Sequence, residues 1–205
     1  IDFALKDLDQ VDKWVLPLAI QSNDPSHNYQ ANPRKFYRRA MLRISPFNDY
    51  SGQYSATAYK VYFNGNEKEA IVPEYHTSYV IDDKTIFFYA GLIDIDRLDR
   101  KYYKIKFEFT EEKIDLQTRK LKISSDNEDI NLVVKGQPSY TVEEEMDATR
   151  PYLKHIYVTI NNLEYEFTDY TSVPGYPLEY VVKGSLTMER KINTQIPDED
   201  QAIEW

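Results

Sequence analysis

The side chains that most often carry out catalysis are sparse or scattered in this sequence. Its three histidines, His27, His76 and His155, stand far apart, and none belongs to an H-E-x-x-H or H-x-H pattern. No G-x-S-x-G or S-x-x-K signature marks a serine nucleophile, and the sequence has no cysteine. Its 6 glycines do not cluster as a phosphate-binding loop requires. We therefore predict a protein that is not an enzyme and uses no cofactor.

Carboxylates are the remaining candidates for catalysis or metal binding. A glycosidase needs two carboxylates facing each other across a cleft, but 34 acidic residues create chance pairs in any fold. The stretches DIDRLD (94–99) and DNEDIN (126–131) each hold several acidic side chains. Both lack the complete spacing and the turn glycine of a calcium loop. We interpret both as acidic loops, predict no metal site, and keep a glycoside hydrolase accessory domain as a less favoured alternative.

Aromatic side chains are the strongest functional candidates. Exposed Trp and Tyr rings mark binding surfaces, and the flat C–H faces of sugars stack on them. In TDYTSVPGYPLEY (168–180), Tyr170 and Tyr176 lie in a loop with proline and glycine, where binding groups gather. Tyr180 alternates with core residues and Trp14 opens an apolar strand, so we expect structural roles for both. The predicted ligand-binding residues are Tyr170, Tyr176 and Trp205.

The charge and hydropathy of the chain narrow the class of partner. The formal net charge is −9 at pH 7, and an acidic body repels phosphate backbones and anionic lipid headgroups. We therefore expect no nucleic-acid partner. No apolar run approaches the roughly 18 residues that span a bilayer, so we also expect no direct membrane insertion of this segment.

Alternation of apolar and polar residues dominates the chain and predicts β-strands. In KYYKIKFEFT (101–110), every second residue from Tyr103 to Phe109 is apolar, and LEYVVKGSLTMER (178–190) alternates in the same way. The 18 tyrosines and 9 phenylalanines favour strands as well. Further strands are expected at 14–20, 36–44, 54–63, 70–81, 84–91, 121–124, 130–135, 154–160 and 163–170.

Turn residues separate these strands. The apolar phase changes at Asn161 and Asn162, which predicts a tight turn or a bulge there. Asn64 and Gly65 are typical of a hairpin, and 81–84 looks like another tight connection. Helical signal is limited to one turn at 94–100 and another at 143–153.

The predicted fold is all-β, and the chain has one internal boundary. Proline, asparagine and glycine cluster in ISPFNDYSG (44–52) between strand-like runs. Residues 1–46 hold only two convincing strands, too few to bury a core. They are interpreted as the end of a larger sandwich or as strands docked on the main body. For 47–205 we predict an antiparallel meander closed as a lipocalin-like barrel or a sandwich.

Three stretches carry a resemblance to a known family: DLDQVDKWVLPLAI (7–20), NDYSGQYSATA (48–58) and MERKINTQIPDEDQAIEW (188–205). Together they resemble Bacteroidetes cell-surface lipoproteins in which an immunoglobulin-like domain precedes a C-terminal β-rich domain of unknown function. The resemblance implies that 1–46 are C-terminal strands of the immunoglobulin-like domain and that 47–205 are the C-terminal module. It carries over no binding or catalytic residue.

The resemblance also implies a location and a role. Such proteins are anchored in the outer membrane by a lipidated cysteine, which would lie upstream of Ile1, and are encoded beside polysaccharide-utilisation systems. We expect a non-catalytic cell-surface protein that binds glycan for an outer-membrane import system, with a glycan and the import proteins as its partners. The alternative is a structural or assembly module that contacts other surface proteins. In either case we expect Ile203 and Trp205 to dock on the sheet.

Overall fold

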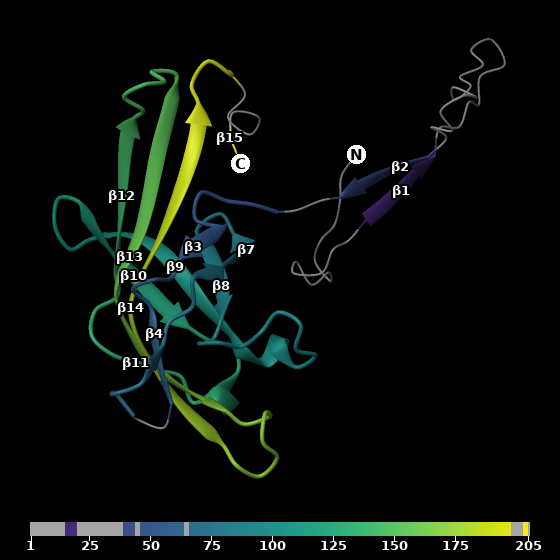
Figure 1. Cartoon of the computed structure of the whole chain (residues 1–205), viewed down its shortest axis with the longest axis vertical. Helices are drawn as coiled ribbons and strands as arrows, with labels where there is room; N and C mark the ends of the chain where they lie inside the picture. Colours follow the sequence, from purple (N-terminus) through teal and green to yellow (C-terminus); the bar gives the residue numbers. More distant parts are fainter. Residues whose placement is uncertain (1–14, 20–38, 44–45, 64–65, 198–202, 205) are drawn as a thin grey trace. The chain divides into compact units, whose positions relative to one another are not determined.

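The computed structural model describes residues 15–19, 39–43, 46–63, 66–197 and 203–204 (Figure 1). Trp14, His27 and Trp205 lie outside these residues, so the predictions about them stay predictions. The chain divides into two compact units, Ile1–Pro46 and Phe47–Trp205. None of the helices in the described ranges has the length and apolar character needed to cross a lipid bilayer.

The regular elements of the described residues are β-strands and two short 3₁₀ helices, which confirms the predicted all-β fold. The first unit holds β1 (Val15–Ala19) and β2 (Arg39–Arg43). The strands of the second unit are β3 (Gln53–Ser55), β4 (Lys60–Phe63), β5 (Ala70–Ile71), β6 (Tyr75–Thr77), β7 (Tyr79–Asp82), β8 (Thr85–Tyr89), β9 (Lys104–Lys113), β10 (Thr118–Ser124), β11 (Val133–Val134), β12 (Ser139–Met146), β13 (Leu153–Asp169), β14 (Leu178–Asn193) and β15 (Ile203–Glu204). The helices are η1 (Arg100–Tyr103) and η2 (Glu128–Ile130).

The described residues of the first unit form an antiparallel pair of strands. β1 pairs with β2 from Val15 opposite Arg43 to Ala19 opposite Arg39. Its apolar side chains are exposed, and Met41 is 82% accessible. A two-stranded hairpin is marginally stable by itself, because it cannot bury such side chains. The assignment of 1–46 to an immunoglobulin-like domain remains a prediction.

The second unit is a sandwich-like antiparallel sheet rather than a closed barrel. Its strand order is β5-β4-β14-β13-β12-β10-β9-β8-β7. β3 pairs with β6 and touches β14 at one residue pair, Ser55 opposite Thr187, while Ser78 separates β6 from β7. The sheet therefore folds back on itself without a continuous barrel ladder. Of the two predicted closures, the sandwich is the one observed.

Aromatic side chains fill the interior of this unit. Tyr103, Phe107 and Phe109, which share the predicted face of 101–110, are at most 1% accessible. Phe88 packs edge-on against Phe107 at 4.9 Å between ring centroids. Such edge-to-face pairs stabilise a core beyond the area that they bury. The predicted strand face is therefore confirmed as the core face.

All three predicted turn features are present, and the tight connection at 81–84 joins β7 to β8. The register between β13 and β14 shifts between Ile160 and Leu163, and Asn162 has a φ of 55°. This confirms a bulge, which β13 passes through as one 17-residue strand. The hairpin between β4 and β5 is also present, although Asn64 and Gly65 at its tip lie outside the described residues.

The helical turn predicted at 143–153 is wrong. Residues 139–146 form β12, which pairs with β13 continuously from Ser139 opposite Asn161 to Met146 opposite Lys154. The run of glutamates favours a helix locally, but the ladder with β13 satisfies the backbone of the whole segment and decides the structure. β12, β13 and β14 consequently extend together beyond the rest of the sheet, as Figure 1 shows.

His76, on β6, is surrounded by aromatic rings. Its ring centroid lies 5.2 Å from that of Tyr59 and 4.9 Å from that of Phe88. Among the described residues, no group is in hydrogen-bonding position for its Nε2. Burial lowers the pKa of His76 to about 4, and a hydrogen bond with the backbone of Tyr89 offsets only part of this effect. The imidazole is therefore neutral in the folded protein at neutral pH.

The depressed pKa of His76 predicts a loss of stability in mild acid. Between pH 6.5 and about 4 the unfolded chain binds a proton at His76 that the folded chain does not, so stability is full above pH 6.5 and falls toward pH 4. The loss amounts to about 3 kcal/mol. Urea unfolding at a series of pH values measures it, and His76→Phe should flatten the profile in this window. His155→Gln should leave that slope in place, because the pKa of His155 is raised. An unchanged slope in His76→Phe would contradict the prediction.

Candidate functional site

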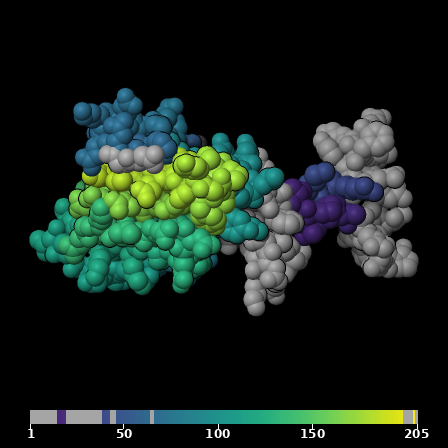
Figure 2. Space-filling view, turned by 90° about the horizontal axis from the view of Figure 1, so that it is seen from below, coloured from purple at the N-terminus to yellow at the C-terminus, as the bar shows by residue number. Residues whose placement is uncertain are grey.

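Three connections gather at one end of the second unit: residues 90–103 between β8 and β9, 125–132 after β10, and 170–177 between β13 and β14. In an antiparallel meander, alternate connections lie at the same end of the sheet. Figure 2 looks onto this end, where the yellow-green segment that includes 170–185 lies beside the blue region of β4 and β5. We call residues 170–177 the tyrosine loop.

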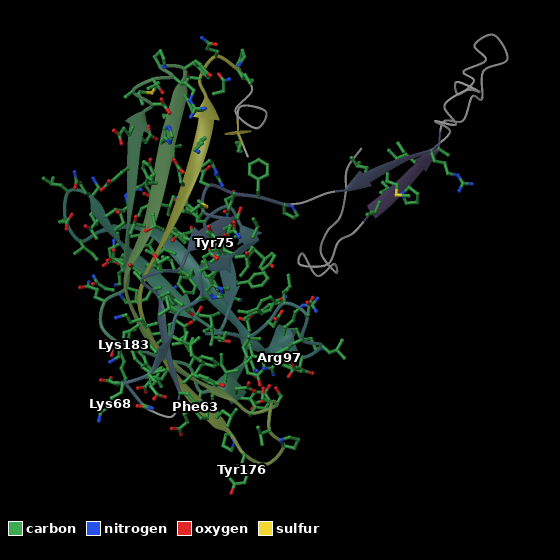
Figure 3. All side chains as sticks on the ribbon, viewed as in Figure 1. Phe63, Lys68, Tyr75, Arg97, Tyr176 and Lys183 are labelled. Carbon is green, nitrogen blue, oxygen red and sulfur yellow. The ribbon has the colours of Figure 1, made fainter. Side chains whose placement is uncertain are left out.

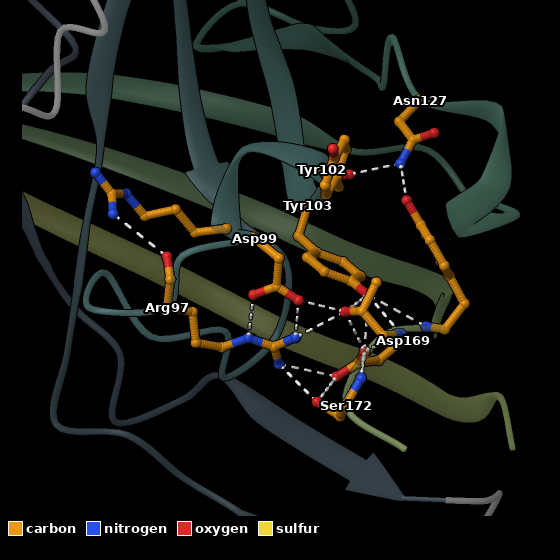
Figure 4. A network of polar contacts seen from close by, with 10 residues as sticks. Arg97, Asp99, Tyr102, Tyr103, Asn127, Asp169 and Ser172 are labelled. Carbon is orange, nitrogen blue, oxygen red and sulfur yellow. Dashed lines mark hydrogen bonds and ion pairs between the residues drawn. The ribbon is translucent and has the colours of Figure 1, made fainter. Parts of the chain in front are cut away.

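Asp169, the last residue of β13, fixes the base of the tyrosine loop. Its side chain is 2% accessible and accepts hydrogen bonds from the hydroxyl of Tyr103 at 2.7 Å and from Nη1 of Arg97 at 3.0 Å. It also accepts from Oγ of Ser172 at 2.5 Å and from the backbone N–H groups of Thr171 and Ser172 at 3.1 and 3.0 Å. Figure 4 shows this arrangement. The carboxylate thus joins the ends of two loops.

Arg97 links a second carboxylate, that of Asp99 on the same connection, to the same point. Its guanidinium forms two parallel bonds to Asp99, at 2.9 Å from Nε and 2.7 Å from Nη2. It also donates to Oγ1 of Thr171 at 2.9 Å and lies over the ring of Tyr103, 5.1 Å from its centroid. Thr171 in turn donates to Asp99. We call Arg97, Asp99, Tyr103, Asp169, Thr171 and Ser172 the Asp169 network.

The network keeps both of its carboxyl groups ionised. Burial tends to raise the pKa of Asp169, but hydrogen bonds from Arg97, Ser172 and Tyr103 outweigh it and hold that pKa well below its usual range. Hydrogen bonds from Arg97 and Thr171 lower the pKa of Asp99 to about 2. A general acid near neutral pH needs a carboxyl group with a raised pKa. Neither group therefore has the raised pKa of a general acid, and their hydrogen bonds hold the loops together.

The two predicted tyrosines of the loop have different surroundings. Tyr170 is half-buried, its hydroxyl accepts a hydrogen bond from Nδ2 of Asn127 at 3.0 Å, and its ring centroid is 5.7 Å from that of Tyr103. Tyr176 is 74% accessible and points away from the body of the protein (Figure 3). The structure thus places both on one loop, with only Tyr176 presenting its ring to solvent. Trp205 lies outside the described residues.

A tight turn holds Tyr176 in this position. The N–H of Tyr176 donates to the carbonyl of Val173 at 2.9 Å, and Gly175 has a φ of 79°. Proline at the second position and a positive-φ glycine at the third are the signature of a type II β-turn, formed here by 173–176. The ring at the tip is therefore carried by a rigid turn on a rigid base.

Residues of the Asp169 network were not predicted as site residues. Asp99 belongs to DIDRLD (94–99), which the sequence led us to interpret as an acidic loop, yet its side chain is only 29% accessible and is paired with Arg97. Asp169 and Arg97 are 72 positions apart in the chain. No local pattern signals such a contact, because it depends on how the sheet brings its loops together.

His155, unlike His76, has charged partners. Its Nδ1 lies 2.6 Å from Oε1 of Glu189, and its Nε2 lies 3.1 Å from Oδ2 of Asp147. These two hydrogen bonds raise the pKa of His155. Because both ring nitrogens face carboxylates, neither is available to activate a nucleophile. Within the described residues, no group of three or more His, Asp or Glu side chains is arranged to hold a metal ion.

Comparison with known proteins identifies the family of this chain. A protein-family model with the description "-like, C-terminal" matches residues 38–187. No significant match was found among curated proteins. The structure of an auxiliary nutrient binding protein from Bacteroides thetaiotaomicron is similar over 99% of the chain, with 46% identity and a TM-score of 0.81.

Two structures from Bacteroides ovatus are similar as well. One is a protein of unknown function, with 40% identity over 97% of the chain and a TM-score of 0.84. The other is a multidomain protein including DUF1735, with 42% identity over 99% of the chain and a TM-score of 0.81. The chain spans 65% of the length of the nutrient binding protein and 64% and 67% of the other two, so each of these relatives is longer than the chain.

Proposed function

This chain belongs to the "-like, C-terminal" family, and from that membership and the geometry of its tyrosine loop we propose that it is a non-catalytic module that binds a nutrient glycan. The nutrient-binding relative from Bacteroides thetaiotaomicron supports the nutrient part of this proposal. The proposed location is the cell surface, with a lipid anchor upstream of Ile1 and outer-membrane import proteins as partners. The Bacteroides origin of the relatives is compatible with that location.

The observation that carries the proposal is the exposure of Tyr176 on a fixed turn. A tyrosine ring that is 74% accessible gains little from folding, so its place in the structure is not explained by packing. A ring fixed before binding loses little conformational freedom when a sugar stacks on it. The Asp169 network and the turn at 173–176 supply that rigidity, which is the property expected of a binding group on a loop.

One observation favours the alternative role in assembly. Val173, beside Tyr176 on the same turn, is 42% accessible, so the tip of the loop also offers aliphatic surface. A protein partner would use that surface together with the ring. The two functions differ in what binds the loop, and a glycan panel separates them.

Affinity electrophoresis of the chain against plant, fungal and mucin glycans tests the proposal. We expect saturable retardation by one class of glycan. Tyr176→Ala should weaken that binding by about five- to tenfold, the loss expected for one stacked ring. The matched control is Tyr75→Ala, which removes a tyrosine that is 52% accessible on β6. Equal effects of the two substitutions, or no retardation by any glycan, would contradict the proposal.

A further inference from the structure

Apart from the tyrosine loop, a concave surface lies where β12, β13 and β14 extend beyond the core. It is a groove of about 760 Å³ on the same strand face that buries Val158. Val142, Ile156 and Ile192, one from each strand, form its aliphatic floor. We call it the strand groove. Figure 1 shows the three strands that form it in the upper part of the second unit.

The strand groove continues toward the turn between β9 and β10. An adjoining hollow of about 510 Å³ shares Arg119, Val142 and Glu144 with it and reaches Leu116 and Gln117 in that turn. The two hollows adjoin through these shared residues and together extend across five strands, β9, β10, β12, β13 and β14. Such a shape fits an extended chain better than a compact small molecule.

The lining combines apolar and hydrogen-bonding groups. Tyr50 borders the groove, and its ring stacks on that of Phe109 at 3.8 Å between centroids and 10° between planes. This packing fixes the position of the ring. Aliphatic side chains and an aromatic wall suit the C–H faces of a sugar, while charged groups at the rim bind its polar substituents.

The charge of the groove differs from that of the chain. Arg119, Lys154 and Arg190 line it against two carboxylates, Asp49 and Glu144, whereas the chain as a whole carries −9. Three cations against two carboxylates leave the lining with an excess of positive charge. An anionic ligand is therefore drawn to this part of an otherwise acidic protein.

Lys154 forms an ion pair with Glu144 at 3.2 Å, whereas the two arginines of the groove are less closely engaged by carboxylates. Arg190 donates mainly to neutral acceptors, the backbone carbonyls of Asn48 at 2.8 Å and Ser51 at 3.1 Å, and reaches Asp49 only at 3.4 Å. Nη1 of Arg119 lies 3.6 Å from Glu111, beyond ordinary hydrogen-bonding distance, and its side chain is 38% accessible. Arg119 also hydrogen-bonds the side chain of Tyr140, and its remaining N–H groups can donate to a ligand carboxylate.

From this shape and charge we propose that the strand groove binds an extended oligosaccharide that carries carboxylate groups, such as a chain of uronic acids. The inference deepens the proposed function and rests on it, since it names a class of glycan and a second contact surface. Arg119 and Lys154 bind the carboxylates, the aliphatic floor contacts the sugar faces, and Arg190 adds a fixed positive charge beneath the ligand.

Calorimetry of the 205-residue chain with oligogalacturonides and with their carboxyl-reduced counterparts tests the groove. We expect the carboxylated chains to bind and the reduced ones to bind at least about tenfold more weakly, as loss of a charge-assisted hydrogen bond predicts. Binding should also weaken in 0.5 M salt, which is roughly three times physiological ionic strength, because salt screens the attraction between the arginines and the carboxylates. Equal affinity for the two ligands would overturn the proposal.

Matched variants locate the interaction. Arg119→Gln should weaken binding of oligogalacturonides about tenfold, and Lys154→Gln should act in the same direction. Lys122→Gln is the control, since Lys122 is on the same strand as Arg119, lies outside the groove and is 64% accessible. Undiminished binding by Arg119→Gln and Lys154→Gln would overturn the groove proposal.

The two proposals can fail separately. If a glycan binds and only Tyr176→Ala weakens it, the groove proposal is wrong while the proposed function stands. If oligogalacturonides bind with full dependence on Arg119 and none on Tyr176, the groove is the site and the tyrosine loop is not. If no glycan binds, both are wrong.

Discussion

Replacing Gly184 by alanine is expected to destabilise the protein by about 3–5 kcal/mol. Gly184 lies on β14 opposite Leu163, next to the bulge in β13, and has a φ of 133°. A Cβ atom there would stand 1.9 Å from the carbonyl oxygen of Ala58 and 3.1 Å from the Cα of Tyr59. Backbone atoms cannot rotate away as a flexible side chain can, so the strand and the turn before β4 would have to separate.

Urea unfolding measures this effect, and Gly136→Ala provides the comparison. Gly136 also has a positive φ, 68°, but no atom lies within 4 Å of a Cβ built there. That substitution should cost about 1 kcal/mol, from backbone strain alone. If Gly184→Ala shifts the unfolding free energy no more than Gly136→Ala does, the close approach of β14 to Ala58 is not present in solution.

Asp169→Ala is expected to lower the unfolding free energy by about 3–5 kcal/mol and to release the tyrosine loop. The substitution removes the acceptor of six hydrogen bonds, from Arg97, Tyr103, two groups of Thr171 and two groups of Ser172. It leaves the hydroxyl of Tyr103 and one arm of Arg97 without this acceptor in a largely buried place. We therefore expect weaker glycan binding along with lower stability.

Thermal or urea unfolding measures the loss of stability. The affinity for the same glycan, measured at a temperature where the variant is folded, tests the predicted loss of binding. Asp126→Ala is the matched control, because Asp126 is 80% accessible and its pair with Lys106 at 2.6 Å is at the surface. Such pairs contribute less than about 1 kcal/mol. Full glycan affinity in folded Asp169→Ala would mean that the network does not position the loop for binding.

The sequence predicted the parts of the fold that depend on local pattern. Alternation of side chains along 101–110 identifies the buried face of β9 correctly, because one strand face is enough to establish it. The phase change at Asn161 and Asn162 predicted a turn or a bulge, and a bulge is present. This feature too is visible in the local alternation of side chains. The choice between barrel and sandwich depends on whether β3 pairs along β14 or touches it once, which no single segment encodes.

Long-range pairing explains what the sequence failed to predict. The segment 143–146 favours a helix by composition and is a strand because β13 lies beside it. Tyr176 was predicted as a binding residue from its loop, and this stays a prediction. Arg97 and Asp169, which hold that loop, are distant in sequence and meet only in the folded sheet. The strand groove could not be predicted from the sequence either. Its floor takes one side chain from each of three strands, so it depends on the register between them.

The most direct test of glycan binding at the tyrosine loop is hydrogen–deuterium exchange of the chain with and without a glycan from the panel. The proposed function predicts slower exchange in 170–177, where Tyr176 and its turn lie. Slower exchange only in 142–146, 154–158 and 190–193 would place the ligand in the strand groove instead. Unchanged exchange throughout, at glycan concentrations that saturate in the panel, would contradict binding at the tyrosine loop.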